Sequence, residues 1–165
     1  MKHYAAASFK ARQSIGYLLK RAHGLLLERA EEAFVNHDVT FMQWVVLLRL
    51  RDGIDRTAAD LVRAVGHDSG ALTRLLDQLE QRGLIERSRS KHDRRVVELS
   101  LTRQGHAMLE SLIPLAVDKL NDALAEFSAA EFRELLRLLD KLIGTLEAKP
   151  AGAQPPAAKA ARKRK

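Results

Sequence analysis

The sequence has no cysteine among its 165 residues. Disulfide bonds, thiolate zinc sites and thiol-based redox sensing are therefore excluded. Long apolar runs are also lacking: the run Val45–Leu48 is far shorter than the roughly 20 residues that span a membrane. The N-terminus is basic, but it has no continuous apolar segment, so we expect no signal peptide and a cytoplasmic, nucleoid-associated protein.

Catalytic and nucleotide-binding motifs are missing as well. The chain contains no G-x-S-x-G, no P-loop, no G-x-G-x-x-G and no H-E-x-x-H. Six histidines are present, but none has the spacing of a metal ligand pair: His3, His23, His37, His67, His92 and His106. We expect no enzyme, no cofactor and no metal, although a fold could still bring separated side chains together around zinc.

The net charge of +7 and the pI of 10.0 invite a nucleic-acid interpretation, but the charge is unevenly placed. Residues 148–165 hold six cations and no acid, which leaves +1 for residues 1–147. This segment is rich in Pro, Gly and Ala without periodicity, which predicts a disordered basic tail. Any argument for DNA binding must therefore rest on where the cations of the body cluster.

Helical periodicity dominates the first half of the chain. Apolar residues recur every three or four positions over residues 9–35, which predicts a long amphipathic helix. Thr40 with Gln43 and Thr57 with Asp60 are capping signatures that open two further helices. Asp68 or Ser69 begins a fourth helix with a leucine stripe, and a glycine at position 83 ends it.

Two short strands follow, and then two more helices. Residues 84–87 and 96–101 have the composition and alternation of a β-hairpin. Helices are then predicted at about 103–127 and from the capping box at Ser128 onward. The fold class is mainly α with a small β-hairpin wing. This order of elements is the layout of a winged helix-turn-helix, with a DNA-binding lobe expected at about 40–102 and long flanking helices at about 9–35 and 103–147.

The fourth helix carries small and polar side chains opposite its leucines. Such residues allow a helix to approach a DNA groove closely and to offer donors to base edges. Taken alone, however, this face is equally typical of an ordinary solvated helix. The candidate major-groove residues are Ser69, Ala71, Thr73, Arg74 and Gln78.

The hairpin favours DNA binding over that simpler explanation. Residues 82–95 contain six cations against two acids, whereas surface loops are usually of mixed sign. A cationic hairpin beside a helix-turn-helix suits the phosphate backbone and the negative potential of a narrow minor groove. The candidate wing residues are Arg95, Arg94, Lys91, Arg89 and Arg87, with Asp93 as the one acid among them.

These motifs resemble the MarR family of bacterial transcription regulators. The matching segments are Asp93–Thr102 with its D-x-R…L-T pattern, Leu72–Arg87, and Gln43-Trp44, and the resemblance covers about residues 10–147. It implies that Arg95 enters the minor groove, that Asp93 fixes the wing through an ion pair, and that residues 68–82 read the major groove.

The resemblance further implies a homodimer that is formed by dimerisation helices at about 9–35 and 103–147 and that binds a pseudo-palindromic operator with half-sites ~10 bp apart. Periodicity independently favours a partner, because the first and last helices carry wide apolar faces on a body with limited core. Many family members are repressors that release DNA when a phenolic or aromatic carboxylate binds. Trp44 and Phe41 could line such a pocket, although a core position for Trp44 is the simpler interpretation.

Two alternatives remain at this point. One is a winged-helix module that acts through protein contacts, with an incidental basic tail. The other is a ligand or metal sensor with little specific DNA binding. Double-stranded DNA, a second copy of the chain and a small aromatic or phenolic effector are the expected partners, with no membrane.

Overall fold

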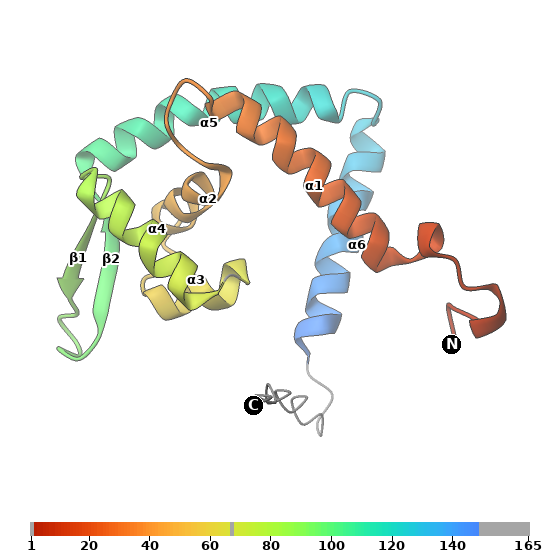
Figure 1. Ribbon diagram of the computed structural model, residues 1–165, viewed down its shortest axis with the longest axis horizontal. Coiled ribbons are helices and arrows are strands. Elements are labelled where there is room, and N and C mark those ends of the chain that lie inside the picture. Colours follow the sequence, from red (N-terminus) through yellow and green to blue (C-terminus); the bar gives the residue numbers. More distant parts are fainter. Residues whose placement is uncertain (1, 67, 149–165) are drawn as a thin grey trace, which may run out of the picture. The chain divides into compact units, whose positions relative to one another are not determined.

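The computed structural model describes residues 2–66 and 68–148, so that His67 and most of the predicted tail lie outside it. The chain divides after Ala123 into two compact units. Its elements are η1 (Ala6–Ser8), η2 (Ala11–Gln13), α1 (Ile15–Phe34), α2 (Phe41–Arg51), α3 (Ala58–Val65), α4 (Ser69–Gln81), β1 (Ile85–Arg89), β2 (Val97–Leu101), α5 (Arg103–Ala123) and α6 (Ala129–Glu147) (Figure 1).

The three predicted capping boxes are present. Thr40 and Gln43 bond reciprocally at the start of α2, Thr57 and Asp60 do so at the start of α3, and Ser128 with Glu131 does so at α6. Each box satisfies two backbone donors that have no partner inside the helix. These short-range hydrogen bonds explain why the predicted starts of these helices agree with the structure.

The prediction of the first helix was wrong at its N-terminal end. The helix begins at Ile15, not at Phe9, because Ser14 is extended and the preceding residues form only two 3₁₀ turns. The hydroxyl of Tyr4 accepts the N–H of Ile15 at 2.9 Å. No side chain of either turn is buried.

The two strands of the hairpin are antiparallel, and each strand is connected to the rest of the unit. Ile85 pairs with Leu101 and Arg89 with Val97, so β1 runs two residues beyond its predicted end. The N–H of Leu99 donates to the carbonyl of Arg56 at 2.8 Å, which joins the segment before α3 to β2. Gly83, with φ at 67°, turns the chain from α4 into the hairpin.

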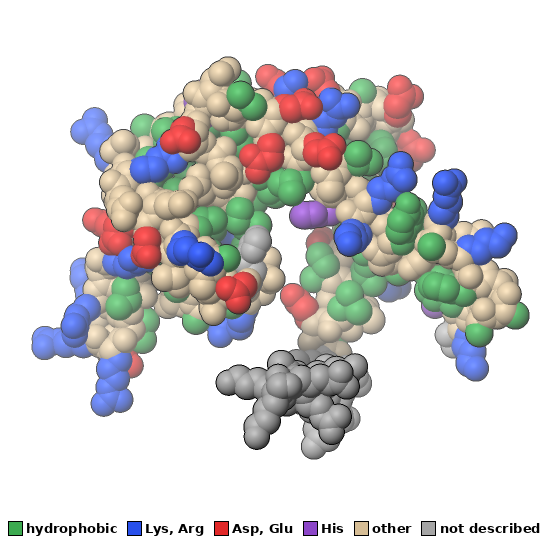
Figure 2. Space-filling view, viewed as in Figure 1, with side chains coloured by type: hydrophobic (Ala, Val, Ile, Leu, Met, Phe, Trp, Pro, Cys, Tyr) green, Lys and Arg blue, Asp and Glu red, His purple; other side chains and the backbone are tan. Residues whose placement is uncertain are grey.

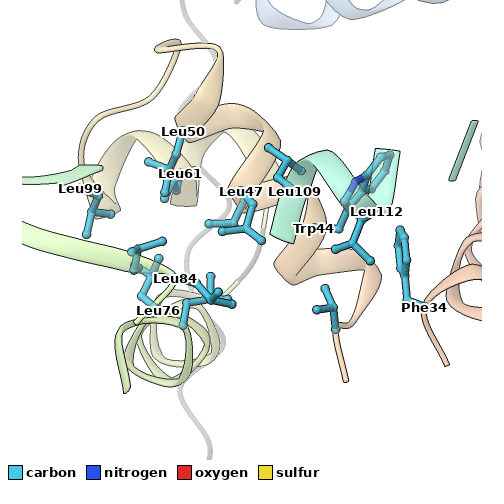
Figure 3. Packing of buried hydrophobic residues seen from close by; sticks show 14 of the residues in the cluster. Phe34, Trp44, Leu47, Leu50, Leu61, Leu76, Leu84, Leu99, Leu109 and Leu112 are labelled. Carbon is cyan, nitrogen blue, oxygen red and sulfur yellow. The ribbon is translucent and has the colours of Figure 1, made fainter. Parts of the chain in front are cut away.

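In the first unit, α2, α3, α4 and α5 contribute buried side chains to one hydrophobic core (Figure 3). Burial of one such leucine contributes about 1.5–3 kcal/mol of transfer free energy, so this cluster holds the hairpin and the helices as one body. Its largest fully buried side chains include Phe34, Leu47, Leu61, Leu72, Leu76, Leu79, Leu84, Leu109 and Leu112.

The helix α5 ends at Ala123, four residues before its predicted end, and a turn from Leu124 to Phe127 follows it. The helix α6, in the second unit, has no buried residue. Among the described residues, no helix combines the length and the apolar composition needed to cross a membrane.

Candidate nucleic-acid interface

The N-terminal half of α4 is an exposed, polar helix end. Asp68 caps it by accepting the N–H groups of Gly70 and Ala71 at 2.9 and 3.2 Å, so these amides are already paired. The Thr73 hydroxyl donates to the carbonyl of Ser69 at 2.8 Å. All four predicted contact residues of this half are exposed: Ser69, Ala71, Thr73 and Arg74. They share a surface that nothing else in the described part of the unit covers.

Gln78, the fifth predicted contact, is also exposed, but it is engaged with the protein. Its side-chain oxygen accepts the side-chain amide of Gln43 on α2 at 3.2 Å. Gln43 is only 6% exposed and also caps its own helix. The structure therefore separates Gln78 from the four residues of the N-terminal half.

A second hydrogen bond holds the same end of α4. Arg82 donates through Nη1 to the backbone carbonyl of Asp38 at 2.5 Å, in the connection between α1 and α2. The two hydrogen bonds flank a cavity of about 620 Å³ that Phe34, Gln43, Gln78 and Arg82 help to line. The C-terminal half of α4 is thus held to its own unit by polar side chains, whereas the N-terminal half buries Leu72 and leaves its polar face exposed.

The wing tip is closed by backbone hydrogen bonds and shaped by Asp93. The N–H of Ser90 donates to the carbonyl of Val96 at 2.9 Å, and Asp93 accepts the N–H of Arg95 at 2.9 Å through its carboxylate. The ion pair expected for Asp93 is not among those formed by the described residues. Asp93 therefore orders the turn through the backbone, as aspartates in Asx turns do.

Four of the predicted wing cations are exposed at this tip: Arg89, Lys91, Arg94 and Arg95. Figure 2 shows Lys and Arg side chains projecting from the hairpin end of the unit. Arg89, Lys91 and Arg94 line one hollow together with the buried Ser90. With Asp93 as the only acid between residues 89 and 95, this tip attracts polyanions.

Arg87, the fifth predicted wing cation, lies in a different environment. Its guanidinium forms ion pairs with Asp77 at 2.7 Å and with Glu80 at 2.6 Å, both on α4. Neither acid was predicted from the sequence as a partner of Arg87. The sequence did carry a signal for this pairing: Asp77 and Glu80 lie three residues apart, and so on one face of the helix that immediately precedes the hairpin.

Trp44 occupies the core rather than an open pocket wall. It is 9% exposed, and its ring lies 5.5 Å from those of Phe34 and Phe41, measured between centroids. Its indole N–H is buried and has no hydrogen-bond acceptor in the described part of the chain. Phe41 is half-buried beside it. This orphaned donor is the one polar feature of the aromatic cluster.

The sequence and fold match known transcription regulators. Residues 37–96 match the model of the MarR family. The repressor NicR of Pseudomonas putida is 29% identical over 135 residues, which cover 82% of this chain and 85% of NicR. A mutant of MarR from E. coli, solved with operator DNA, is 30% identical with a TM-score of 0.70, over 78% of this chain and 93% of that chain. The chain belongs to the MarR family.

A third relative within the MarR family is BpsR of Bordetella bronchiseptica, whose DNA binding is regulated by 6-hydroxynicotinic acid. It is 27% identical with a TM-score of 0.73, over 82% of this chain and 96% of that chain. The predicted fold class, a mainly α winged helix-turn-helix with a β-hairpin wing, is therefore confirmed, and the bounds of its DNA-binding lobe stay a prediction. The roles of the individual side chains stay predictions.

Proposed function

We propose that this MarR-family protein is a sequence-specific, ligand-responsive transcriptional repressor that binds its operator as a homodimer. The exposed polar face of the N-terminal half of α4, together with the exposed cations of the wing tip in the same unit, is the observation that carries the proposal. A helix end of this kind reads base edges in the major groove, while an arginine-rich hairpin follows the backbone and the narrow minor groove. In this arrangement residues 40–102 contact DNA in the bacterial cytoplasm.

The roles of the exposed side chains follow from their positions. Arg95, beside the Asp93 turn, enters the minor groove, and Arg89, Lys91 and Arg94 neutralise phosphates. The exposed face of the N-terminal half of α4 offers small side chains for close approach and Arg74 as a donor to a base edge. Major-groove residues are thus Ser69, Ala71, Thr73 and Arg74.

Exposed apolar surface on two separate helices supports a homodimer. Monomeric proteins rarely leave large contiguous apolar patches in water. On α1 the exposed large apolar residues are Ile15, Tyr17, Leu18, Leu19, Leu25 and Leu26. On α6 they are Phe132, Leu136, Leu138, Ile143 and Leu146. A symmetric partner would bury both faces and would place two α4 helices on a pseudo-palindrome.

The aromatic cluster of Trp44, Phe34 and Phe41 supports the ligand response. An aromatic acid such as the 6-hydroxynicotinic acid that regulates BpsR carries acceptor oxygens and a stacking surface. Because the indole N–H of Trp44 is buried, such an effector would have to displace neighbouring side chains to reach Trp44 and Phe41, and one of its oxygens would then accept the unpaired indole N–H. Binding there would alter the packing of α2 and so the separation of the two α4 helices, a coupling of about 1–3 kcal/mol.

Selection of bound fragments from bacterial genomic DNA tests the repressor function. The full-length protein and a chain of residues 1–147 should enrich the same pseudo-palindrome. If only the full-length chain binds, without sequence preference, its binding comes from the basic tail and the protein is a winged-helix module of another kind.

The effector is tested with 6-hydroxynicotinic acid as the probe. Because Trp44 is the only tryptophan, its fluorescence reports the aromatic cluster directly. Saturable quenching together with release of the selected operator supports the proposed pocket. Release without any change at Trp44 would place the effector elsewhere.

A further inference from the structure

The guanidinium of Arg87 joins the wing to the recognition helix α4. It bonds to Asp77 at 2.7 Å through Nη2 and to Glu80 at 2.6 Å through Nη1. The two carboxylates lie three residues apart and therefore on one face of α4. Arg87 lies on β1, the strand that leads into the wing tip. One side chain thus connects the two elements that are proposed to contact DNA.

The charges around this guanidinium leave Arg87 unsuited to bind a phosphate. Two carboxylates surround one guanidinium, so the group of three carries a net formal charge of −1. A phosphate would have to displace a carboxylate from a short, charge-assisted hydrogen bond. Arg89, two residues further along the same strand, is exposed and forms none of the ion pairs found among the described residues. These two arginines therefore differ in environment although both were predicted to bind DNA.

The opposite side of α4 is held independently. Gln78 bonds to Gln43 and Arg82 bonds to the Asp38 carbonyl, and at 3.6 residues per turn both lie on roughly the far side from Asp77 and Glu80. The helix is therefore fixed to its unit without Arg87. The ion pairs of Arg87 orient the wing against a helix that is already in place.

We propose that Arg87 is a positioning residue that sets the angle between the wing and α4 and does not itself touch DNA. This rests on the proposed function. Operator binding needs the α4 end and Arg95 to reach adjacent grooves at the same time, and a wing tip whose tilt against α4 varies loses that match. The contribution is moderate, because the three side chains are 30–45% exposed and water and salt screen the pairs.

The matched variants Arg87→Gln and Arg89→Gln test this inference. Each removes one positive charge from β1. We expect Arg87→Gln to weaken operator binding about tenfold. The dependence of log affinity on log salt should keep its wild-type slope, and footprinting should show weaker protection by the wing with protection by α4 retained. Arg89→Gln should instead reduce the slope by about 0.9 for each phosphate that the variant no longer neutralises.

A second variant shows whether a folding defect explains the result for Arg87→Gln. The double substitution Asp77→Asn with Glu80→Gln keeps Arg87 but releases it, and should weaken wing protection in the same way. If Arg87→Gln lowers the salt slope as Arg89→Gln does, Arg87 binds a phosphate and the inference fails. It also fails if both the affinity and the wing footprint stay at wild-type values.

Hydrogen exchange without DNA separates this inference from the proposed function. Amides of β1 and β2 should exchange faster in Arg87→Gln than in Arg89→Gln, while the exchange of α4 stays unchanged. Unchanged exchange of the hairpin would overturn the positioning role. Absence of a specific operator for the wild-type protein would overturn the repressor proposal instead, and the exchange result would still decide whether Arg87 holds the wing.

Discussion

Gly105 in α5 lies directly against the backbone carbonyl of Leu84, so closely that a β-carbon on Gly105 would be 1.9 Å from that oxygen. Leu84 itself is buried and precedes β1. Nearby, the Thr102 hydroxyl donates to the carbonyl of Gly83 and accepts the N–H of Gly105 at 3.0 Å. The base of the wing is therefore packed against the start of α5 through backbone atoms and the Thr102 hydroxyl.

Substitution of Gly105 by alanine should destabilise the fold. The new methyl group would force α5 away from the segment that leads into β1, at a cost of about 2 kcal/mol or more in the free energy of unfolding. Gly144→Ala is the matched control, because nothing lies within 4 Å of its added β-carbon. In a helix interior that change should stabilise by up to about 1 kcal/mol. Denaturant unfolding measures both, and equal effects would contradict the close packing at Gly105.

Removal of the Arg95 side chain should reduce operator affinity while the protein stays folded and dimeric. An arginine in a narrow minor groove gains from its negative potential, and Arg95→Ala should cost about tenfold or more in affinity. Arg133→Ala, an exposed cation on α6, serves as the control. Electrophoretic mobility shifts measure affinity and light scattering measures the dimer. An affinity equal to that of the control would refute the assigned role.

Substitution of Arg74 should change sequence preference rather than overall affinity. If Arg74 contacts a base edge, Arg74→Ala should relax discrimination at particular base pairs by about 1–3 kcal/mol. Repeating the fragment selection with this variant measures the base preference at each position of the operator. A uniform loss over all sequences would instead assign Arg74 to a phosphate.

Acid should remove the stabilisation that Asp60 gives to α3. The Thr57 hydroxyl hydrogen bond, together with the backbone N–H groups of Arg56 and Thr57, holds the pKa of Asp60 below its ordinary value of 3.8. The contribution is therefore complete above pH 3.8 and is lost as the pH falls through the lowered pKa of the folded state.

A comparison of wild type with Asp60→Asn measures this effect. The difference in unfolding free energy between the two proteins should stay constant from neutral pH down to the pKa of the unfolded state, and then shrink. A difference that grows on acidification would have the wrong sign for a depressed carboxyl pKa.

The sequence by itself determined the features that depend on neighbouring residues. Capping boxes at Thr40, Thr57 and Ser128 join groups three residues apart, so a local pattern is enough to predict them. The same holds for the leucine stripe of α4 and for the cationic turn around Asp93, where charge and turn chemistry are read directly from adjacent positions.

Only the tertiary structure decided which polar side chains are available to DNA. Gln78 and Arg87 belong to the same sequence pattern as Arg74 and Arg89. Yet Gln78 meets Gln43, 35 residues away, and Arg87 meets two acids on a different element. Likewise, α1 begins at Ile15 rather than at Phe9: Ser14 is extended, and the N–H of Ile15 donates to the hydroxyl of Tyr4, 11 residues away. Such outcomes depend on partners that tertiary packing supplies.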